Sequence, residues 1–242
     1  MFEIGSLEFK AYAKLTRYLP ARMAARLDFL IPQLRDCWGG PLNGQEKRRQ
    51  MFVQILRSLT WQAIVETGTY RAVTTEFLRS TSELPVYSIE TNPRFYRYSS
   101  LRLRADPEAR ILLGDSRLRL EQLAGAETFP KERVLFYLDA HWGGHLPLRD
   151  EVSFITQHWH DVAIVIDDFE VPDDPAYGFD RYEDGSELRV EYLDVHETLG
   201  LQVFRPSAPG AEETGERRGC VVLATQGLVA GKLSGLDTVR PG

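Results

Sequence analysis

From Trp61 to Ala224, short apolar runs alternate with amphipathic segments, and this alternation restricts the fold more than any other feature of the sequence. The main apolar runs are QAIVE, PVYSIE, RILLGD, VLFYLD and DVAIVIDD, with helix-like segments such as VTTEFLRS between them. Strands that alternate with helices form a parallel sheet covered by helices on both faces. VLFYLD and AIVID are almost wholly apolar, as strands buried on both sides are. The pattern predicts a doubly wound, Rossmann-like α/β domain.

The C-terminal part of this pattern differs from the rest. A possible helix around ELRVEYLDVHETL precedes two apolar runs, LQVFRP and GCVVLA, which the charged turn GAEETGERR separates. Two strands joined by a turn-rich connection resemble an antiparallel hairpin. We therefore predict a mostly parallel, seven-stranded sheet with an antiparallel last strand. The sequence gives no clear pattern after Thr225.

The N-terminal segment has a different character from the alternating region. Apolar residues recur at helical spacings before the stretch CWGGPLNGQ, and a helix with Phe52, Ile55 and Leu56 on one face then leads into the first strand. We predict an N-terminal helical cap over residues 1–44 and a single α/β domain over residues 45–242.

Composition narrows the classes of partner. The 242 residues are 43% hydrophobic and carry a formal net charge of -6, so one domain can bury a core but creates no field that attracts nucleic acid. The arginine-rich stretch Arg94–Arg104 indicates a solvated helix face, with an RNA-binding surface as the alternative. Two cysteines without paired spacing favour a reducing cytoplasm, and the charged N-terminus predicts neither a signal peptide nor a membrane span.

Acidic residues end the predicted strands, where an open α/β sheet binds its ligands. The first run ends at Glu66 and turns through Gly68, which allows a tight turn whose free N–H groups can meet a ligand; such a turn is also common for structural reasons alone. Glu90 follows Glu66 at about the spacing, roughly 20 residues, at which an acid reaches a ribose hydroxyl. The alternative role of Glu90 is at the start of the next helix, beside Asn92. Asp115 could accept the amine of adenine while Ser116 caps a helix, or both could serve the cap alone.

Together these acids and the turn Glu66-Thr67-Gly68-Thr69 resemble the pattern of class I S-adenosylmethionine-dependent methyltransferases. The resemblance implies a methionine moiety over the turn near Gly68, ribose at Glu90 and adenine near Asp115 and Ser116. Ala72 stands where the pattern has its final glycine, so a slightly different turn is expected. The full cofactor-binding set implied is Glu66, Gly68, Thr69, Tyr70, Thr74, Glu90, Asp115, Ser116 and Asp139.

Three carboxylates at the ends of the two central strands predict a metal site. Asp139, Asp167 and Asp168 would repel one another in a buried setting unless a cation joined them. Oxygen ligands favour magnesium, calcium or manganese over zinc, and we expect Mg²⁺. This set resembles that of the metal-dependent small-molecule O-methyltransferases, of the catechol type and the macrocin type. In the alternative, Asp139 orients the cofactor amine and the other two cap the next segment.

His141 is the candidate catalytic base, working beside Asp139, because macrocin-type enzymes carry an acidic residue at this place and imidazole accepts protons near neutrality. Its alternative is a structural hydrogen bond beside Trp142, and His145 is a weaker candidate. The aromatic loop Phe169–Ser186 suits a lid or substrate wall. Asn43 and Gln45 are expected to fold over the cofactor. The expected substrate-contacting residues are Trp142, Tyr177, Phe179 and Tyr182.

These expectations define an enzyme that methylates a hydroxyl group of a small molecule, such as a sugar or secondary metabolite, with S-adenosylmethionine and a divalent metal. Two alternatives stay open. An NAD-dependent oxidoreductase would carry a G-x-G-x-x-G motif and, in common versions, a Tyr-x-x-x-Lys pair, and the sequence has neither. A catalytically silent cofactor-binding protein would have lost its acidic set. We expect a cytoplasmic protein that binds no nucleic acid or membrane, and a homo-oligomer is possible.

Overall fold

A computed structural model describes residues 6–141, 144–193 and 199–242. One sheet of eight strands forms its centre, in the order β3-β2-β1-β4-β5-β7-β6-β8. The strands are β1 (Ala63–Thr67), β2 (Val86–Glu90), β3 (Ala109–Leu113), β4 (Val134–Leu138), β5 (Ala163–Asp167), β6 (Leu201–Pro206), β7 (Cys220–Thr225) and β8 (Val239–Pro241). Strands β1 to β5 are parallel, and β7 pairs antiparallel with both β5 and β6.

The predicted doubly wound α/β class and the antiparallel hairpin of β6 and β7 are confirmed. The sheet differs from the prediction by an additional strand, β8, which pairs antiparallel with β6. This strand has three residues, ends in a proline and lies at the sheet edge, so it carries no alternating pattern that the sequence could reveal. The possible helix around residues 187–199 is also different: its described part holds a single helical turn, Val190–Leu193, and residues 194–198 lie outside the described part.

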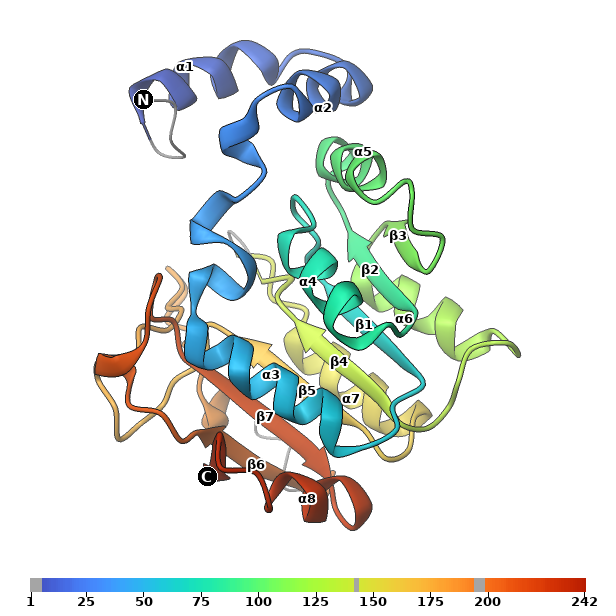
Figure 1. Cartoon of the computed structure of the whole chain (residues 1–242), viewed down its shortest axis with the longest axis vertical. Coiled ribbons are helices and arrows are strands. Elements are labelled where there is room, and N and C mark those ends of the chain that lie inside the picture. Colours follow the sequence, from blue (N-terminus) through green and yellow to red (C-terminus); the bar gives the residue numbers. More distant parts are fainter. Residues whose placement is uncertain (1–5, 142–143, 194–198) are drawn as a thin grey trace.

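Helices cover both faces of the sheet (Figure 1). Helices α3 (Glu46–Ser58), α4 (Val73–Ser82) and α8 (Leu228–Leu233) share one apolar core with the sheet, and α6 (Ser116–Gly125) and α7 (Leu148–His158) share the other. Strand β4 shows how the sequence divides its side chains: Phe136 packs edge-on against Trp159, and Tyr137 packs against Phe52 of α3 on the opposite face. Each such buried side chain contributes about 1.5–3 kcal/mol. The alternating side chains of this one apolar strand therefore contribute to both cores.

The N-terminal segment is helical, as the spacing predicted, and lies at one end of the molecule (Figure 1). Helix α1 (Leu7–Thr16) is followed by α2 (Ala21–Phe29), which packs against α5 (Pro93–Arg102). Short 3-10 turns at Pro32–Leu34, Cys37–Gly39 and Pro41–Gly44 then return the chain to α3. None of the described helices combines the length and the apolar character that crossing a bilayer requires.

Asp28, a fully buried acid of α2, anchors this helical segment to the α/β domain. Its carboxylate accepts hydrogen bonds from Arg94 Nε of α5 at 2.8 Å and from the Tyr12 hydroxyl of α1 at 2.8 Å, and it lies 3.4 Å from Nη2 of the buried Arg71. A buried charge is tolerated only when it is paired and hydrogen-bonded. This one carboxylate therefore joins α1, α2, α5 and the turn before α4.

Replacing Asp28 with asparagine keeps the side-chain shape and removes the charge that Arg71 and Arg94 share. We expect the free energy of unfolding to fall by about 3–5 kcal/mol, the usual cost of leaving one partner of a buried ion pair uncompensated. Urea denaturation measures this loss. The control is Asp36→Asn, which changes an exposed acid of the same segment and should shift stability by less than about 0.5 kcal/mol. Equal stability of the two variants would contradict the anchoring role.

Candidate active site

A cavity of about 880 Å³ opens at the carboxyl ends of β1, β2, β4 and β5. Its walls come from four parts of the chain: the N-terminal segment, the turns after the strands, the loop after β5 and the segment before β7. Of the residues predicted to bind the cofactor or a metal, seven line it: Gly68, Tyr70, Glu90, Asp115, Ser116, Asp139 and Asp168. Asn43, expected to fold over the cofactor, lines it too, and Gln45 does not appear in its wall.

The turn after β1 has the tight backbone that the glycine predicted. Gly68 has φ +90°, and a Cβ there would lie 2.2 Å from the carbonyl oxygen of Asp139, so no other residue fits. Ala72, in place of the pattern's last glycine, takes the left-handed conformation with φ +58° at the start of α4. The turn thus keeps the backbone of a glycine at a position occupied by alanine, at a cost of about 1–2 kcal/mol.

Glu90 is held in one orientation by main-chain groups. Its Oε2 accepts a hydrogen bond from Tyr70 N and its Oε1 accepts one from Asn92 N, both at 2.7 Å. Burial raises the pKa of Glu90, and these N–H groups lower it in part. The helix cap itself is Asn92, whose side chain accepts from Arg94 N at 2.9 Å. Each carboxylate oxygen has a second lone pair, so Glu90 can still receive hydroxyl groups of a ligand.

Glu66, Thr69 and Thr74 lie behind the turn and do not line the cavity. Glu66 is buried and accepts hydrogen bonds from the hydroxyls of Thr75 and Ser88, and burial raises its pKa to about 7. The Thr69 hydroxyl lies 2.5 Å from that of Ser88, and the Thr74 hydroxyl accepts from Leu42 N at 3.1 Å. These groups join β1, β2 and α4 and hold the turn in place.

Asp115 combines the two roles that the sequence left open. It is the N-cap of α6, accepting from Arg117 N at 3.0 Å, and it also lines the cavity, with Arg117 Nη2 at 2.9 Å from its Oδ2. Hydrogen bonding to Arg117 lowers the pKa of Asp115, which keeps it ionised. The structure gives the cap to Asp115 and not to Ser116, which is the first residue of the helix and is buried against the cavity wall.

Asp139, His141 and Asp168 bring one ligand atom each to a common point, with all three atoms within 4.8 Å of one another. Asp139 follows β4, and Asp168 follows β5 with a left-handed backbone at φ +53°. Burial and the neighbouring carboxylate of Asp168 raise the pKa of Asp139 well above its usual value. The cluster contains two of the three predicted metal ligands, and an imidazole completes it.

Asp167, the third predicted ligand, lies outside this cluster. It ends β5 on the same side of the pleat as Val165, which belongs to the α3 core, and there it forms a buried ion pair with Arg48. Its Oδ2 also accepts from the Tyr137 hydroxyl at 2.7 Å and from Asn43 at 3.3 Å. The alternation of side chains along a strand therefore sends Asp167 and Asp168 to different surroundings.

Arg218 and Asp180 are site residues that sequence reasoning missed. Arg218 Nε donates to Asp168 Oδ1 at 2.6 Å, and its Nη2 donates to Asp180. Its main chain is fixed by Gln45, whose Nε2 donates to the Arg218 carbonyl at 2.9 Å. A signal was present: Arg218 immediately precedes the predicted antiparallel strand, whose first residue must lie at the edge where the parallel strands end.

His141 is 3% exposed, and burial lowers its pKa to about 4. Its Nε2 has no hydrogen-bond partner among the described residues. Its carbonyl accepts from the Tyr182 hydroxyl at 3.3 Å, so one of the predicted substrate residues supports this loop. Neighbouring Trp142, also expected to contact the substrate, lies outside the described residues. His145, the weaker candidate base, is exposed and lines the cavity 3.8 Å from Asp115.

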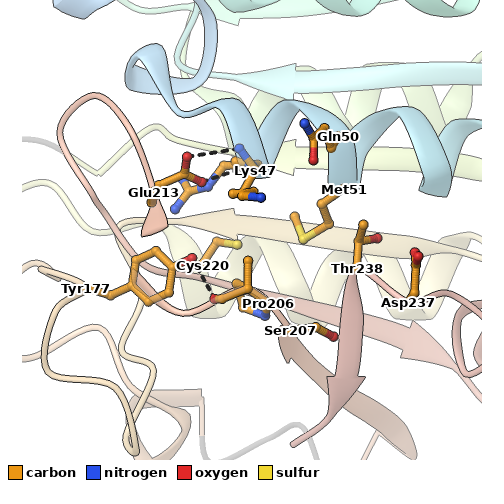
Figure 2. Close-up of a pocket in the computed structure, with 12 residues that line it drawn as sticks. Lys47, Gln50, Met51, Tyr177, Pro206, Ser207, Glu213, Cys220, Asp237 and Thr238 are labelled. Carbon is orange, nitrogen blue, oxygen red and sulfur yellow. Dashed lines mark hydrogen bonds between the residues drawn. The ribbon is translucent and has the colours of Figure 1, made fainter. Parts of the chain in front are cut away.

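The other aromatic residues of the loop lie away from the cavity wall. The ring of Phe179 is covered by the guanidinium of Arg181 at 4.4 Å. Tyr177 lines a second, smaller cavity of about 250 Å³ between α3 and the β6–β7 end of the sheet, and donates to the Ala208 carbonyl at 3.1 Å. Figure 2 shows this cavity, where Glu213 accepts from the main-chain N–H groups of Lys47 and Arg48 at the start of α3. These contacts serve packing between elements.

Comparison with known proteins supports the fold. No protein-family model and no curated protein matches the chain. Among solved structures, an O-methyltransferase from Bacillus cereus in complex with S-adenosylhomocysteine is 15% identical with a TM-score of 0.52, covering 89% of this chain and 97% of its own. The O-methyltransferase TomG from Streptomyces achromogenes, in complex with S-adenosylmethionine, has the same identity and score and is covered over 96% of its length. The chain therefore has the class I methyltransferase fold.

Glu151 of α7 is a buried carboxyl behind the cavity wall, at 1% exposure. Burial raises its pKa to about 7 from 4.5. Because the folded state holds this proton more tightly than the unfolded chain does, the contribution to stability is complete below pH 4.5 and is lost as the pH rises through 7.

Replacing Glu151 with glutamine should remove that pH dependence, because the amide cannot ionise. We expect the stability of the native protein relative to the variant to fall by about 3 kcal/mol, an order-of-magnitude value, between pH 4.5 and pH 8. Urea denaturation at a series of pH values measures it. Glu121→Gln, at an exposed site on α6, is the control and should keep the native pH profile. Parallel profiles for native protein and Glu151→Gln would refute the raised pKa.

Proposed function

We propose that the chain is an S-adenosylmethionine-dependent methyltransferase that transfers the methyl group to a hydroxyl oxygen of a small molecule. One observation carries this proposal. The glycine turn, the oriented carboxylate of Glu90 and the two aspartates of the Asp139-His141-Asp168 cluster line the same cavity, and its volume of about 880 Å³ leaves room for more than one small ligand. A cofactor and an acceptor can therefore meet beside the cluster.

The residues present fit the cofactor. Gly68 leaves the backbone open where any Cβ would collide with Asp139, Glu90 offers lone pairs to ribose hydroxyls, and Asp115 and Ser116 lie where adenine is expected. Bound S-adenosylmethionine would supply an electrophilic methyl carbon on a sulfonium sulfur. Phe9 and Trp38 of the N-terminal segment line the same cavity and would cover part of a bound cofactor.

The acidic cluster would hold and activate the acceptor. A hydroxyl must lose its proton as its oxygen bonds to the methyl carbon, and a divalent cation would lower the pKa of that hydroxyl. Asp139 and Asp168 supply carboxylate ligands to such a cation, which the sequence predicted to be Mg²⁺. His141 has two available roles here, as proton acceptor or as the third ligand.

The alternative of an NAD-dependent oxidoreductase has less support. In the common dinucleotide-binding order the sixth strand pairs with the fifth, whereas here the antiparallel β7 lies between β5 and β6. A catalytically silent protein would have no need of the acidic cluster. The acceptor is proposed as a hydroxylated sugar or secondary metabolite, and a cytoplasmic location and a homo-oligomeric assembly stay predictions.

Calorimetric titration with S-adenosylhomocysteine and with NAD tests the proposal before any acceptor is known. We expect micromolar binding of the former and no comparable binding of NAD. Glu90→Ala should weaken binding by about 10- to 150-fold, because hydrogen bonds to a charged group contribute roughly 1.5–3 kcal/mol. Glu121→Ala, at an exposed carboxylate of α6 outside the cavity, should bind as the native protein does. Binding of NAD alone would reject the methyltransferase in favour of an oxidoreductase.

A further inference from the structure

We propose that Asp139, His141 and Asp168 form a mixed oxygen and nitrogen site that selects a first-row transition metal ion over magnesium. The inference deepens the proposed function and rests on it for the role of the metal. It replaces the all-oxygen set that the sequence predicted, because the third ligand is an imidazole and not the carboxylate of Asp167.

The geometry allows all three side chains to reach one ion. Ligand atoms lie about 2.0–2.2 Å from a zinc-sized ion, so at tetrahedral angles two ligands are about 3.3–3.6 Å apart. The three ligand atoms lie within 4.8 Å of one another, so closure around one ion needs them to approach by up to about 1.5 Å. Side-chain rotation of the two half-buried aspartates provides that movement.

His141 supplies an observation independent of the acidic residues. It is 3% exposed, and its buried Nε2 finds no hydrogen-bond partner among the described residues. A buried polar atom without a partner destabilises the fold and requires an explanation. An ion held between this imidazole and the two aspartates explains why a histidine is placed here.

The surroundings of Asp167 explain why the predicted set of three carboxylates does not form. Both oxygens of Asp167 are engaged by Arg48, Tyr137 and Asn43, so recruiting it would leave the buried guanidinium of Arg48 without its counter-charge. Magnesium requires oxygen ligands and dehydrates reluctantly, whereas imidazole suits zinc, iron, cobalt and nickel. Two carboxylates and one imidazole therefore favour the transition metals.

Arg218 reduces the repulsion among the carboxylates of the site. It shares its guanidinium between Asp168 and Asp180, so one positive charge offsets part of the negative charge of these two carboxylates and of nearby Asp139. Only Asp168 Oδ1 is used by Arg218 Nε, at 2.6 Å. An ion can bind at the cluster while Arg218 keeps its hydrogen bonds to Asp168 and Asp180.

The test uses metal binding, not activity. The full chain, saturated with S-adenosylhomocysteine, is titrated with Co²⁺, Zn²⁺ and Mg²⁺ by calorimetry, and the visible absorption of Co²⁺ reports nitrogen coordination. We expect Co²⁺ and Zn²⁺ to bind about 100-fold or more tightly than Mg²⁺, at one site per chain. Equal affinity for Mg²⁺ and Co²⁺ in the native protein would overturn the inference.

Variants then locate the ligand. His141→Asp should make the site all-oxygen, so the ratio of Co²⁺ to Mg²⁺ affinity should fall at least tenfold and the Co²⁺ spectrum should change. His160→Asp, at an exposed histidine outside the cavity lining, should leave both unchanged. An unchanged affinity ratio and Co²⁺ spectrum in His141→Asp would overturn the inference and return His141 to the role of base. Binding of S-adenosylhomocysteine without any Co²⁺ site would defeat the metal inference alone, and loss of cofactor binding would defeat the proposed function.

Discussion

The buried ion pair between Arg48 and Asp167 is the interaction on which the site depends. It joins α3 to the end of β5, and Arg48 also donates to the carbonyl of Arg218, which leads into β7. Breaking such a pair by removing one partner costs about 3–5 kcal/mol, because the remaining charge stays buried. Since this pair fixes Asp167 on the α3 side of the sheet, only Asp168 can turn toward the cavity. The Arg48–Asp167 ion pair lies outside the acidic cluster, yet it determines which aspartate belongs to the cluster.

The antiparallel strand β7 adds the second constraint. Asp167 pairs in register with Cys220, so the residue two positions before Cys220 reaches the edge where β4 and β5 end. An all-parallel continuation would place the other end of the strand there and would bring no guanidinium to Asp168. The same reversal lets the loop after β5 approach the segment before β7, where Gly178 and Arg218 form a bridge. One change of strand direction thus assembles the acceptor side of the cavity.

Much of this arrangement could be predicted from the sequence, because apolar alternation and strand-end acids are local signals. The doubly wound sheet, the β6–β7 hairpin, the tight turn at Gly68 and the place of Glu90 all follow from residues close together in the chain. The side-chain partners of Glu66 could not be predicted in this way. Ser88 and Thr75 come from β2 and α4, and only the packed structure shows that their hydroxyls both donate to its Oε2.

The adjacent acids Asp167 and Asp168 show where local reasoning stops and what would extend it. Both residues follow an apolar run, so the sequence predicts both as metal ligands. Successive side chains of a strand, however, point to opposite faces of the sheet. Val165 and Asp167 are two positions apart, so their side chains point to the same face of the sheet, which α3 covers. Helix α3 carries Arg48 at a buried position. Combining strand parity with a search for a basic residue on the covering helix separates a structural acid from a ligand. Applied to the end of β5, it would assign Asp167 to Arg48 and leave Asp168 as the acid that faces the cavity.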